Sequence, residues 1–260
     1  MANTLKEKVI LLSTLKAINK VVTPKLSELG FLYSGKRDPI SWGYSRIYKD
    51  AEQHIYFEKI SSNPNRIRFV LGTSVSLETA SYKRFAKELP PLGMEYTDEA
   101  SLCEALNILT EIIIKQGLSW LDVMSTPDVR PSAEMNALFM NTLAGRAERF
   151  IQAYNLNYSQ PNFVELLQDI VREQSLNGEK EADWEFIMDA SAALGEYIRN
   201  NLGGEWADYM VHKMPGIVNI GEKQNIRANP IFWISRYWGR PYYDPYELRK
   251  MINGVTNLSR

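Results

Sequence analysis

Residues 39–77 read PISWGYSRIYKDAEQHIYFEKISSNPNRIRFVLGTSVSL, a stretch rich in aromatic and β-branched residues. Such residues fit the pleated, half-buried surface of a strand. Three segments within it, 39–48, 53–61 and 66–77, are separated by the turn clusters Lys49-Asp50 and Asn63-Pro64-Asn65. Turn residues at these positions favour hairpins. The sequence therefore predicts an antiparallel meander of three or four strands.

Helical patterns flank this meander on both sides. Between residues 4 and 29, apolar residues recur every three or four positions, which places one apolar stripe on a helix. Pro24 lies inside the pattern and predicts a kink or a new helical turn. Asp98 is a suitable N-cap for a second helix with its own apolar face. Residues 1–125 are thus predicted to form an α+β domain, in which a helix at each end covers one face of the sheet.

Residues 131–260 are predicted to form a second domain, a helix-rich α+β one. A stretch containing Pro127 and Pro131 separates it from the first domain. Helical patterns cover 132–154, 162–175 and 183–202. Short extended pieces around 206–220 follow, and then an aromatic stretch from Pro230 to Tyr246.

Composition excludes several classes of protein. The 260 residues are 45% hydrophobic and 23% charged, which is typical of a globular chain and not of a disordered or membrane-embedded one. With 30 basic and 31 acidic residues, no net field draws the whole molecule to nucleic acid. The apolar run Val9–Leu12 is too short for a secretory leader, and we find no bilayer-spanning segment. We therefore expect a cytoplasmic protein with no membrane partner.

No motif predicts a catalytic, cofactor or metal site. Residues 30–37, GFLYSGKR, match the start of the phosphate-cradling pattern G-x-x-x-x-G-K-[ST], but Arg37 replaces the hydroxyl residue and a helix precedes the motif. We interpret the stretch as a C-capping glycine followed by an exposed basic turn. His54 and His212 lie far apart in the sequence. Cys103 has no predicted basic neighbour and is interpreted as a small core residue.

An acidic stretch is the first candidate binding surface. Residues 161–208 contain 11 acidic and three basic residues, a net charge of −8. Within it, Glu179, Glu181 and Asp183 are candidate partner-binding residues, because an acidic surface steers a basic partner. The competing interpretation is a solvated helix start, where acids suit the helix dipole.

The aromatic stretch is the second candidate. Seven of the residues from Ile231 to Tyr246 are aromatic, and arginines lie among them. This mixture is typical of interface hot spots, of surfaces that stack nucleobases, and of a core whose arginines reach outward. All three interpretations stay open, with nucleic acid the least favoured. The candidate residues are Trp233, Arg236, Tyr237, Trp238, Arg240 and Tyr242.

Short motifs carry a resemblance to known families. In the first half they are Leu29-Gly30-Phe31, Ser34-Gly35-Lys36-Arg37, Trp42, Tyr44, Phe69, Leu71, Gly72 and Gly117-Leu118-Ser119-Trp120-Leu121. Over residues 5–125 the chain resembles an uncharacterised bacterial domain family of one helix, an antiparallel meander and a closing helix, although Ser119 stands where that family suggests proline. With Leu194–Arg199, Leu202–Trp206 and Asn229-Pro230, the second half is faintly similar to another uncharacterised bacterial domain. Both families are similar to proteins found in toxin–immunity settings.

These observations lead to one functional hypothesis and one alternative. We expect a non-catalytic, cytoplasmic protein-binding protein, in its most concrete form a bacterial immunity protein that sequesters a toxin. The alternative is a hydrolase or nucleotide-handling enzyme whose carboxylates and tyrosines meet between the two domains.

Overall fold

The computed structural model describes residues 2–209, 214–221 and 225–259. The chain divides into two compact units, Met1–Pro127 and Asp128–Arg260. Helices and antiparallel sheet are both present, which confirms the predicted α+β class. No helix among the described residues is both long and apolar enough to cross a bilayer.

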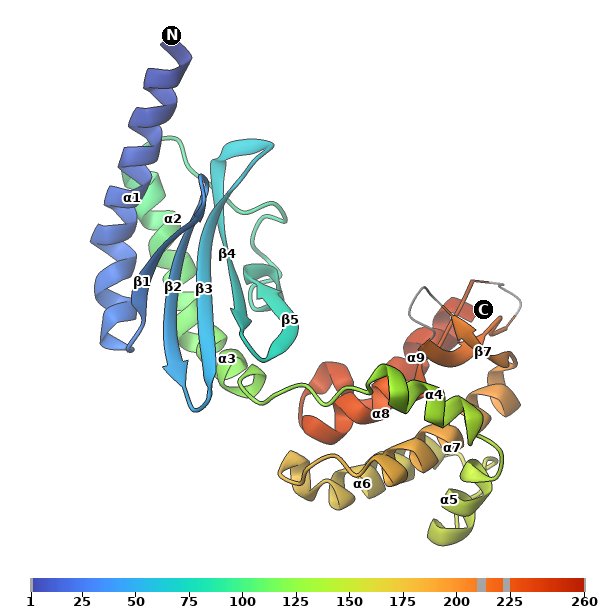
Figure 1. The fold of residues 1–260 in the computed structure, drawn as a ribbon. Coiled ribbons are helices and arrows are strands. Elements are labelled where there is room, and N and C mark those ends of the chain that lie inside the picture. The colour runs from blue at the N-terminus through green and yellow to red at the C-terminus, as the bar shows by residue number, and fades with distance from the viewer. Residues whose placement is uncertain (1, 210–213, 222–224, 260) are drawn as a thin grey trace. The chain divides into compact units, whose positions relative to one another are not determined.

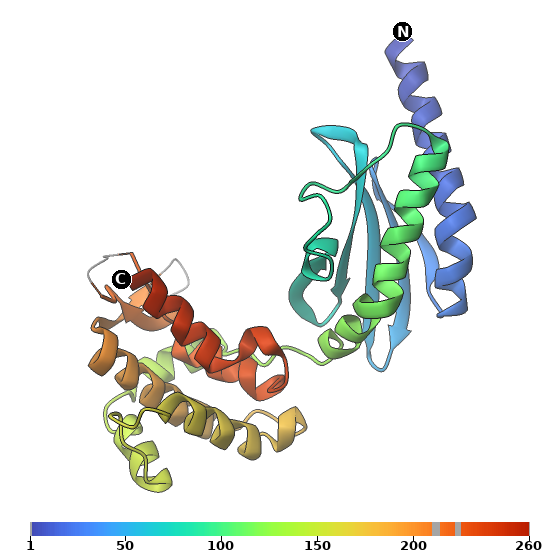
Figure 2. The same cartoon turned by 180° about the vertical axis from the view of Figure 1, so that it is seen from behind.

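Unit 1 is an antiparallel sheet with helices on one face (Figures 1 and 2). Its five main strands follow one another in chain order, and β6 pairs with β4. The predicted three or four strands were too few. The strands are β1 (Leu32–Asp38), β2 (Ser41–Tyr48), β3 (Ala51–Ile60), β4 (Asn63–Thr73), β5 (Ser76–Ser81) and β6 (Met94–Glu95).

The helices of unit 1 are α1 (Ala2–Glu28), α2 (Glu99–Ile112) and α3 (Leu118–Met124), with a π-helical turn at Ile113–Gly117 between the last two. Asp98 caps α2 as predicted, because its carboxylate accepts a hydrogen bond from the Ser101 amide at 2.8 Å. Pro24 lies within α1, which continues to Glu28.

Alternating residues of the strands build the core of unit 1. Along β3, every second residue from Ala51 is buried, as period 2 requires. Trp42 of β2 pairs with Phe57 of β3, which pairs with Phe69 of β4, and all three side chains are fully buried.

A partly buried polar network is centred on the buried side chain of Gln53. Gln53 donates to the Asp122 carboxylate at 3.0 Å and to the Ser125 hydroxyl at 2.9 Å, and it accepts from Arg46 Nε at 2.8 Å. Arg46 also donates to the carbonyl of Leu29 at 2.8 Å. The network joins the sheet to the end of α1 and to α3.

The edge strand β1 was not predicted. The stretch interpreted as an exposed basic turn is this strand, although Gly30 does take the left-handed conformation (φ 82°) of a helix C-cap. Pairing of β1 with β2 is irregular between Tyr33 and Gly35 and again between Lys36 and Asp38. Gly35 itself has φ 100°. The turn between β2 and β3 lies at Lys49-Asp50 as predicted, but the turn between β3 and β4 lies at Ser61-Ser62, and Asn63 already begins β4.

Unit 2 is packed around helix α7 (Trp184–Leu202). Residues 190–195 of α7 are all buried and mostly small, so neighbouring elements approach closely. A Cβ atom on Gly195 would lie 2.0 Å from the ring of Trp206. The other elements are α4 (Ala133–Asn141), α5 (Arg146–Tyr154), α6 (Phe163–Gln174), β7 (Glu205–Tyr209), β8 (Met214–Val218), α8 (Pro230–Gly239) and α9 (Leu248–Ser259).

Two helical boundaries in unit 2 differ from the prediction. The pattern over 132–154 is two helices, because Gly145 adopts a left-handed conformation (φ 79°) between α4 and α5. The helix α9 was not predicted. The helices predicted at 162–175 and 183–202 are confirmed as α6 and α7.

Candidate functional site

The predicted aromatic stretch is mainly core. Most of the stretch forms helix α8. Asn229 caps this helix by accepting a hydrogen bond from the Phe232 amide at 3.0 Å, and Pro230 occupies its first turn. Tyr237 and Trp238 are fully buried, and Trp238 Nε1 donates to the carbonyl of Lys180 at 3.0 Å. Because a partner cannot reach these two rings, their assignment to a binding surface was wrong and the core interpretation holds.

The two candidate arginines of this stretch do not reach outward. Arg240 is only 5% exposed, and its guanidinium forms an ion pair with Asp128, so its assignment to a partner surface was also wrong. Arg236 is half-buried, and its guanidinium carbon lies 4.0 Å from the centre of the Tyr246 ring. Trp233 is half-buried on the same helix.

The predicted acidic residues lie on a short connection that packs against the end of α8. A 3₁₀ turn at Leu176–Gly178 leads into it. Tyr242, 71% exposed, is hydrogen-bonded to Asn177 with 2.6 Å between the phenol and amide oxygens. A Cβ atom on Gly178 would lie 2.8 Å from the carbonyl oxygen of Gly239, so the two backbones touch. Two candidate stretches some sixty residues apart are therefore neighbours in space.

We call Glu179, Glu181 and Asp183 the acidic margin. Glu179 and Glu181 are exposed, and neither forms an ion pair with another residue that the structure describes. Asp183 is half-buried and is the N-cap of α7, accepting from the Phe186 amide at 3.2 Å. Its carboxylate also lies 3.4 Å from the ammonium of Lys180. Asp183 thus has a structural role as well as a charge, as the competing interpretation required.

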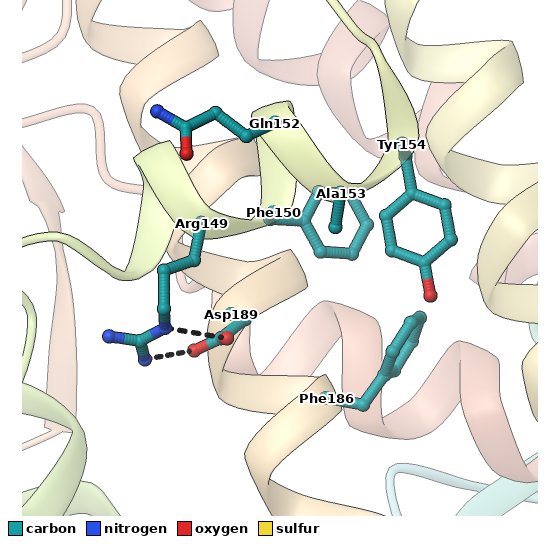
Figure 3. Close-up of a pocket in the computed structure, with 7 residues that line it drawn as sticks. All are labelled: Arg149, Phe150, Gln152, Ala153, Tyr154, Phe186 and Asp189. Atoms are coloured by element: carbon teal, nitrogen blue, oxygen red, sulfur yellow. Dashed lines mark hydrogen bonds and ion pairs between the residues drawn. The ribbon is translucent and has the colours of Figure 1, made fainter.

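An open depression of about 620 Å³ lies between α5 and α7, and we call it the aromatic groove (Figure 3). Of the acidic margin, Asp183 is close enough for its charge to act on the groove residue Tyr154. Tyr154 reaches from the end of α5 towards Phe186 of α7, with their ring centres 6.2 Å apart and at right angles. Phe150 lies 4.7 Å from Tyr154 and 5.7 Å from Phe186. The lining residues are Arg149, Phe150, Gln152, Ala153, Tyr154, Phe186 and Asp189.

The aromatic groove connects to the acidic margin and to the core. Phe186 lies 5.4 Å from the buried ring of Trp238, over which Lys180 places its ammonium at 5.7 Å. Burial and, to a smaller extent, the charge of Asp183 raise the pKa of the Tyr154 hydroxyl, so this phenol stays neutral at physiological pH. The ring of Tyr154 therefore lies within the electrostatic influence of the acidic margin.

Ion pairs form the opposite wall of the groove. Arg149 donates to both carboxylate oxygens of Asp189, at 3.3 and 2.9 Å. Arg146, whose side chain is 3% exposed, donates to Asp189 at 2.6 Å and to Glu185 at 3.0 Å. Burial of the Arg146 guanidinium opposes its charge, but hydrogen bonds to Glu185 and Asp189 outweigh this effect and raise its pKa. These ion pairs link α5 to α7.

The sequence did not predict the groove, although it carried one signal. Arg146, Phe150 and Tyr154 recur every four residues and so share one face of α5. Their partners on α7 become neighbours only in the folded chain. A second open depression, of about 550 Å³, lies near the start of α5 and includes Tyr158, Glu196 and Trp206.

Other candidate residues do not assemble with the groove. His54 lies on β3 and stacks on Tyr56 with ring centres 5.8 Å apart. Cys103 is half-buried on α2, so its assignment to the core was only partly right. His212 lies outside the described residues. In the described part of the chain, no three His, Cys, Asp or Glu side chains are grouped as metal ligands. An enzyme site between the domains stays a prediction, since the units are not placed relative to one another.

Comparison of the chain with protein-family models, with curated proteins and with solved structures gave no match.

Proposed function

We propose that this chain is a bacterial, cytoplasmic binding protein that acts without catalysis and holds a protein partner on the aromatic groove and the acidic margin. The observation that carries this proposal is the position of Glu179 and Glu181. They are exposed and without an ion pair to any described residue. They flank Lys180, whose ammonium lies over the ring of Trp238, and that ring in turn contacts Phe186 of the groove.

The chemistry of this surface favours a partner with basic and apolar groups. Aromatic side chains bury a large area at a small cost in conformational entropy, which is why they anchor interfaces. Unpaired carboxylates nearby accelerate the encounter with a positively charged surface. Residues 161–208 carry 11 acidic and three basic residues, although two of these acids, Glu185 and Asp189, are paired with Arg146 and Arg149 from outside the stretch.

A nuclease toxin is the partner that we propose. Its active cleft must attract phosphates and is therefore basic, so an acidic surface with aromatic anchors can cover it. The resemblance of both halves of the chain to families found in toxin–immunity settings supports the same choice.

The test is the association of the full chain with a panel of catalytically inactivated bacterial toxins, both nucleases and others, measured in real time at several salt concentrations. We expect a nuclease to bind, with a rate that falls as salt rises. The double variant Glu179→Lys/Glu181→Lys should slow association about tenfold. Asp183 is left unchanged because its carboxylate caps α7.

Matched controls separate a local effect from a change in net charge. Glu28→Lys/Glu88→Lys alters two exposed acids of unit 1 by the same total charge and should change the rate much less. Tyr154→Ala should mainly speed dissociation, by about thirtyfold if the ring is a hot spot. Binding that is insensitive to salt, or equal losses in both double variants, would contradict this surface. A panel in which no nuclease binds would contradict the proposed partner.

A further inference from the structure

A lysine without an acceptor is buried in unit 1, far along the chain from the aromatic groove. Lys59 lies on the inner face of β3, two residues after Phe57, and is only 4% exposed. Its ammonium lies 5.7 Å from the centre of the Tyr96 ring. No hydrogen bond or ion pair joins this ammonium to a described residue, and its nitrogen is not among the fully buried unpaired atoms, so it keeps some contact with solvent. The side chain is nevertheless nearly enclosed, and an ammonium that loses most of its water without gaining an acceptor is destabilised.

A second donor on the same face also lacks an acceptor. Trp42 of β2 is fully buried, and its indole Nε1 has no hydrogen-bond partner among the residues described. Trp42 pairs with Phe57, so Trp42 and Lys59 occupy adjacent strands one step apart on the inner face. Most buried side-chain donors in proteins do find a partner, and an unmatched one calls for an ion or a water.

A second cation adjoins these two groups. Lys36 pairs with Trp42 across β1 and β2, and its ammonium lies 5.7 Å from the centre of the Trp42 ring. Burial lowers the pKa of Lys59, and the charge of Lys36 lowers it further. Two lysines therefore raise each other's energy at one corner of the sheet, and no carboxylate is among the groups that shift Lys59.

We infer that this corner, formed by Lys36, Trp42 and Lys59, is a binding site for a small oxyanion, a phosphate or carboxylate group. An oxyanion has several lone pairs and can accept from two ammonium groups and an indole N–H together. Its charge compensates the two lysines, which an ordered water cannot do. The exposed side chain of Lys36 gives the ligand a way in from the β1 edge.

The site is unlike a phosphate-cradling loop, although Lys36 belongs to the stretch that matches that pattern. Here Lys36 lies on a strand and contributes its side chain alone. Recognition by two point charges and one donor favours a terminal phosphate, which carries up to about two negative charges near neutral pH, over a diester or a carboxylate, which carries one. The inference is independent of the proposed function, which uses unit 2 only.

The test follows the indole ¹H–¹⁵N signal of Trp42 in the full chain, assigned by its loss in Trp42→Phe. Inorganic phosphate and acetate are titrated separately against sodium chloride of equal ionic strength. We expect a saturable shift with phosphate, with acetate, or with both, and the two titrations show which oxyanion is preferred. No saturable shift with either oxyanion overturns the inference.

Variants give a second readout. Lys59→Met should weaken binding at least about tenfold, whereas Lys20→Met, an exposed lysine of α1, should leave it unchanged. Equal binding in Lys59→Met and in the unmodified chain overturns the inference. If Lys59→Met does not fold, Lys36→Met takes its place, because that side chain is exposed. An unchanged affinity in Lys36→Met would also overturn the inference.

Discussion

Replacing Arg146 by methionine removes the guanidinium beneath the aromatic groove while keeping an apolar side chain of similar reach. In the folded chain this group bridges Glu185 and Asp189 from a side chain that is 3% exposed. Breaking a fully buried pair costs about 3–5 kcal/mol. Glu185 is 71% exposed and contributes little, since exposed pairs are worth about 0–1 kcal/mol.

The expected cost for Arg146→Met is therefore set by Asp189. This carboxylate is 21% exposed and keeps its second partner, Arg149, at 2.9 Å. Removing Arg146 therefore destabilises the Asp189 carboxylate less than it would destabilise a carboxylate left with no partner. We expect the local free energy of unfolding of α5 against α7 to fall by about 2 kcal/mol.

The measurement is amide hydrogen exchange of the full chain by mass spectrometry, read over α5 and α7, because it resolves local opening within one unit. Arg149→Met is the matched control. It removes a guanidinium from the same carboxylate, but that side chain is 57% exposed, so less than about 1 kcal/mol should be lost. In Arg146→Met/Asp189→Leu much of the loss should be recovered, as no charge is stranded. Equal effects of Arg146→Met and Arg149→Met would refute the reasoning.

Three further outcomes are expected. Gln53→Leu leaves Arg46 and Asp122 without a shared partner and should destabilise unit 1 by about 2 kcal/mol, seen as faster hydrogen exchange in β3 and α3. Gly195→Ala places a methyl group 2.0 Å from the ring of Trp206 and should lower the thermal midpoint at a cost of about 1–3 kcal/mol, whereas Gly254→Ala, with open space around its Cβ, should not lower it. Burial is the main cause that raises the pKa of Tyr44, Tyr96, Tyr158 and Tyr237 to about 12. The unfolded chain releases these protons near pH 10, so the contribution of these tyrosines to stability should be constant below that pH. It should be lost between pH 10 and 12, measured by urea unfolding together with tyrosinate absorbance.

Local signals in the sequence predicted the elements that local chemistry determines. Asp98 caps α2 because its carboxylate oxygen satisfies a free backbone amide nearby. The meander was predictable because its strands are rich in aromatic and β-branched residues and turn residues lie between them. Strand β1 was missed because this edge strand is exposed on most of its length and carries no such enrichment.

The candidate site depended on contacts that no local pattern encodes. Residues 132–154 keep a helical apolar spacing, but the helix is interrupted between Asn141 and Arg146, where Thr142 leaves the helical conformation and Gly145 is left-handed. Tyr237 and Trp238 had the composition of an interface, yet unit 2 uses them to fill its core. In the groove, Tyr154 of α5 contacts Phe186 of α7, and this contact depends on how the chain between the two helices folds.

The irregular edge strand β1 has a consequence for the chain at high concentration. A regular edge would present evenly spaced amides and carbonyls to another molecule and would invite intermolecular strand addition. In β1, the left-handed Gly35 and two breaks in register make the spacing of the backbone amides and carbonyls uneven. In addition, the positive charges of Lys36 and Arg37 repel a second copy of the same edge. Fibrillar self-assembly through β1 is thereby opposed, even though Leu32 leaves an apolar side chain 71% exposed at its start.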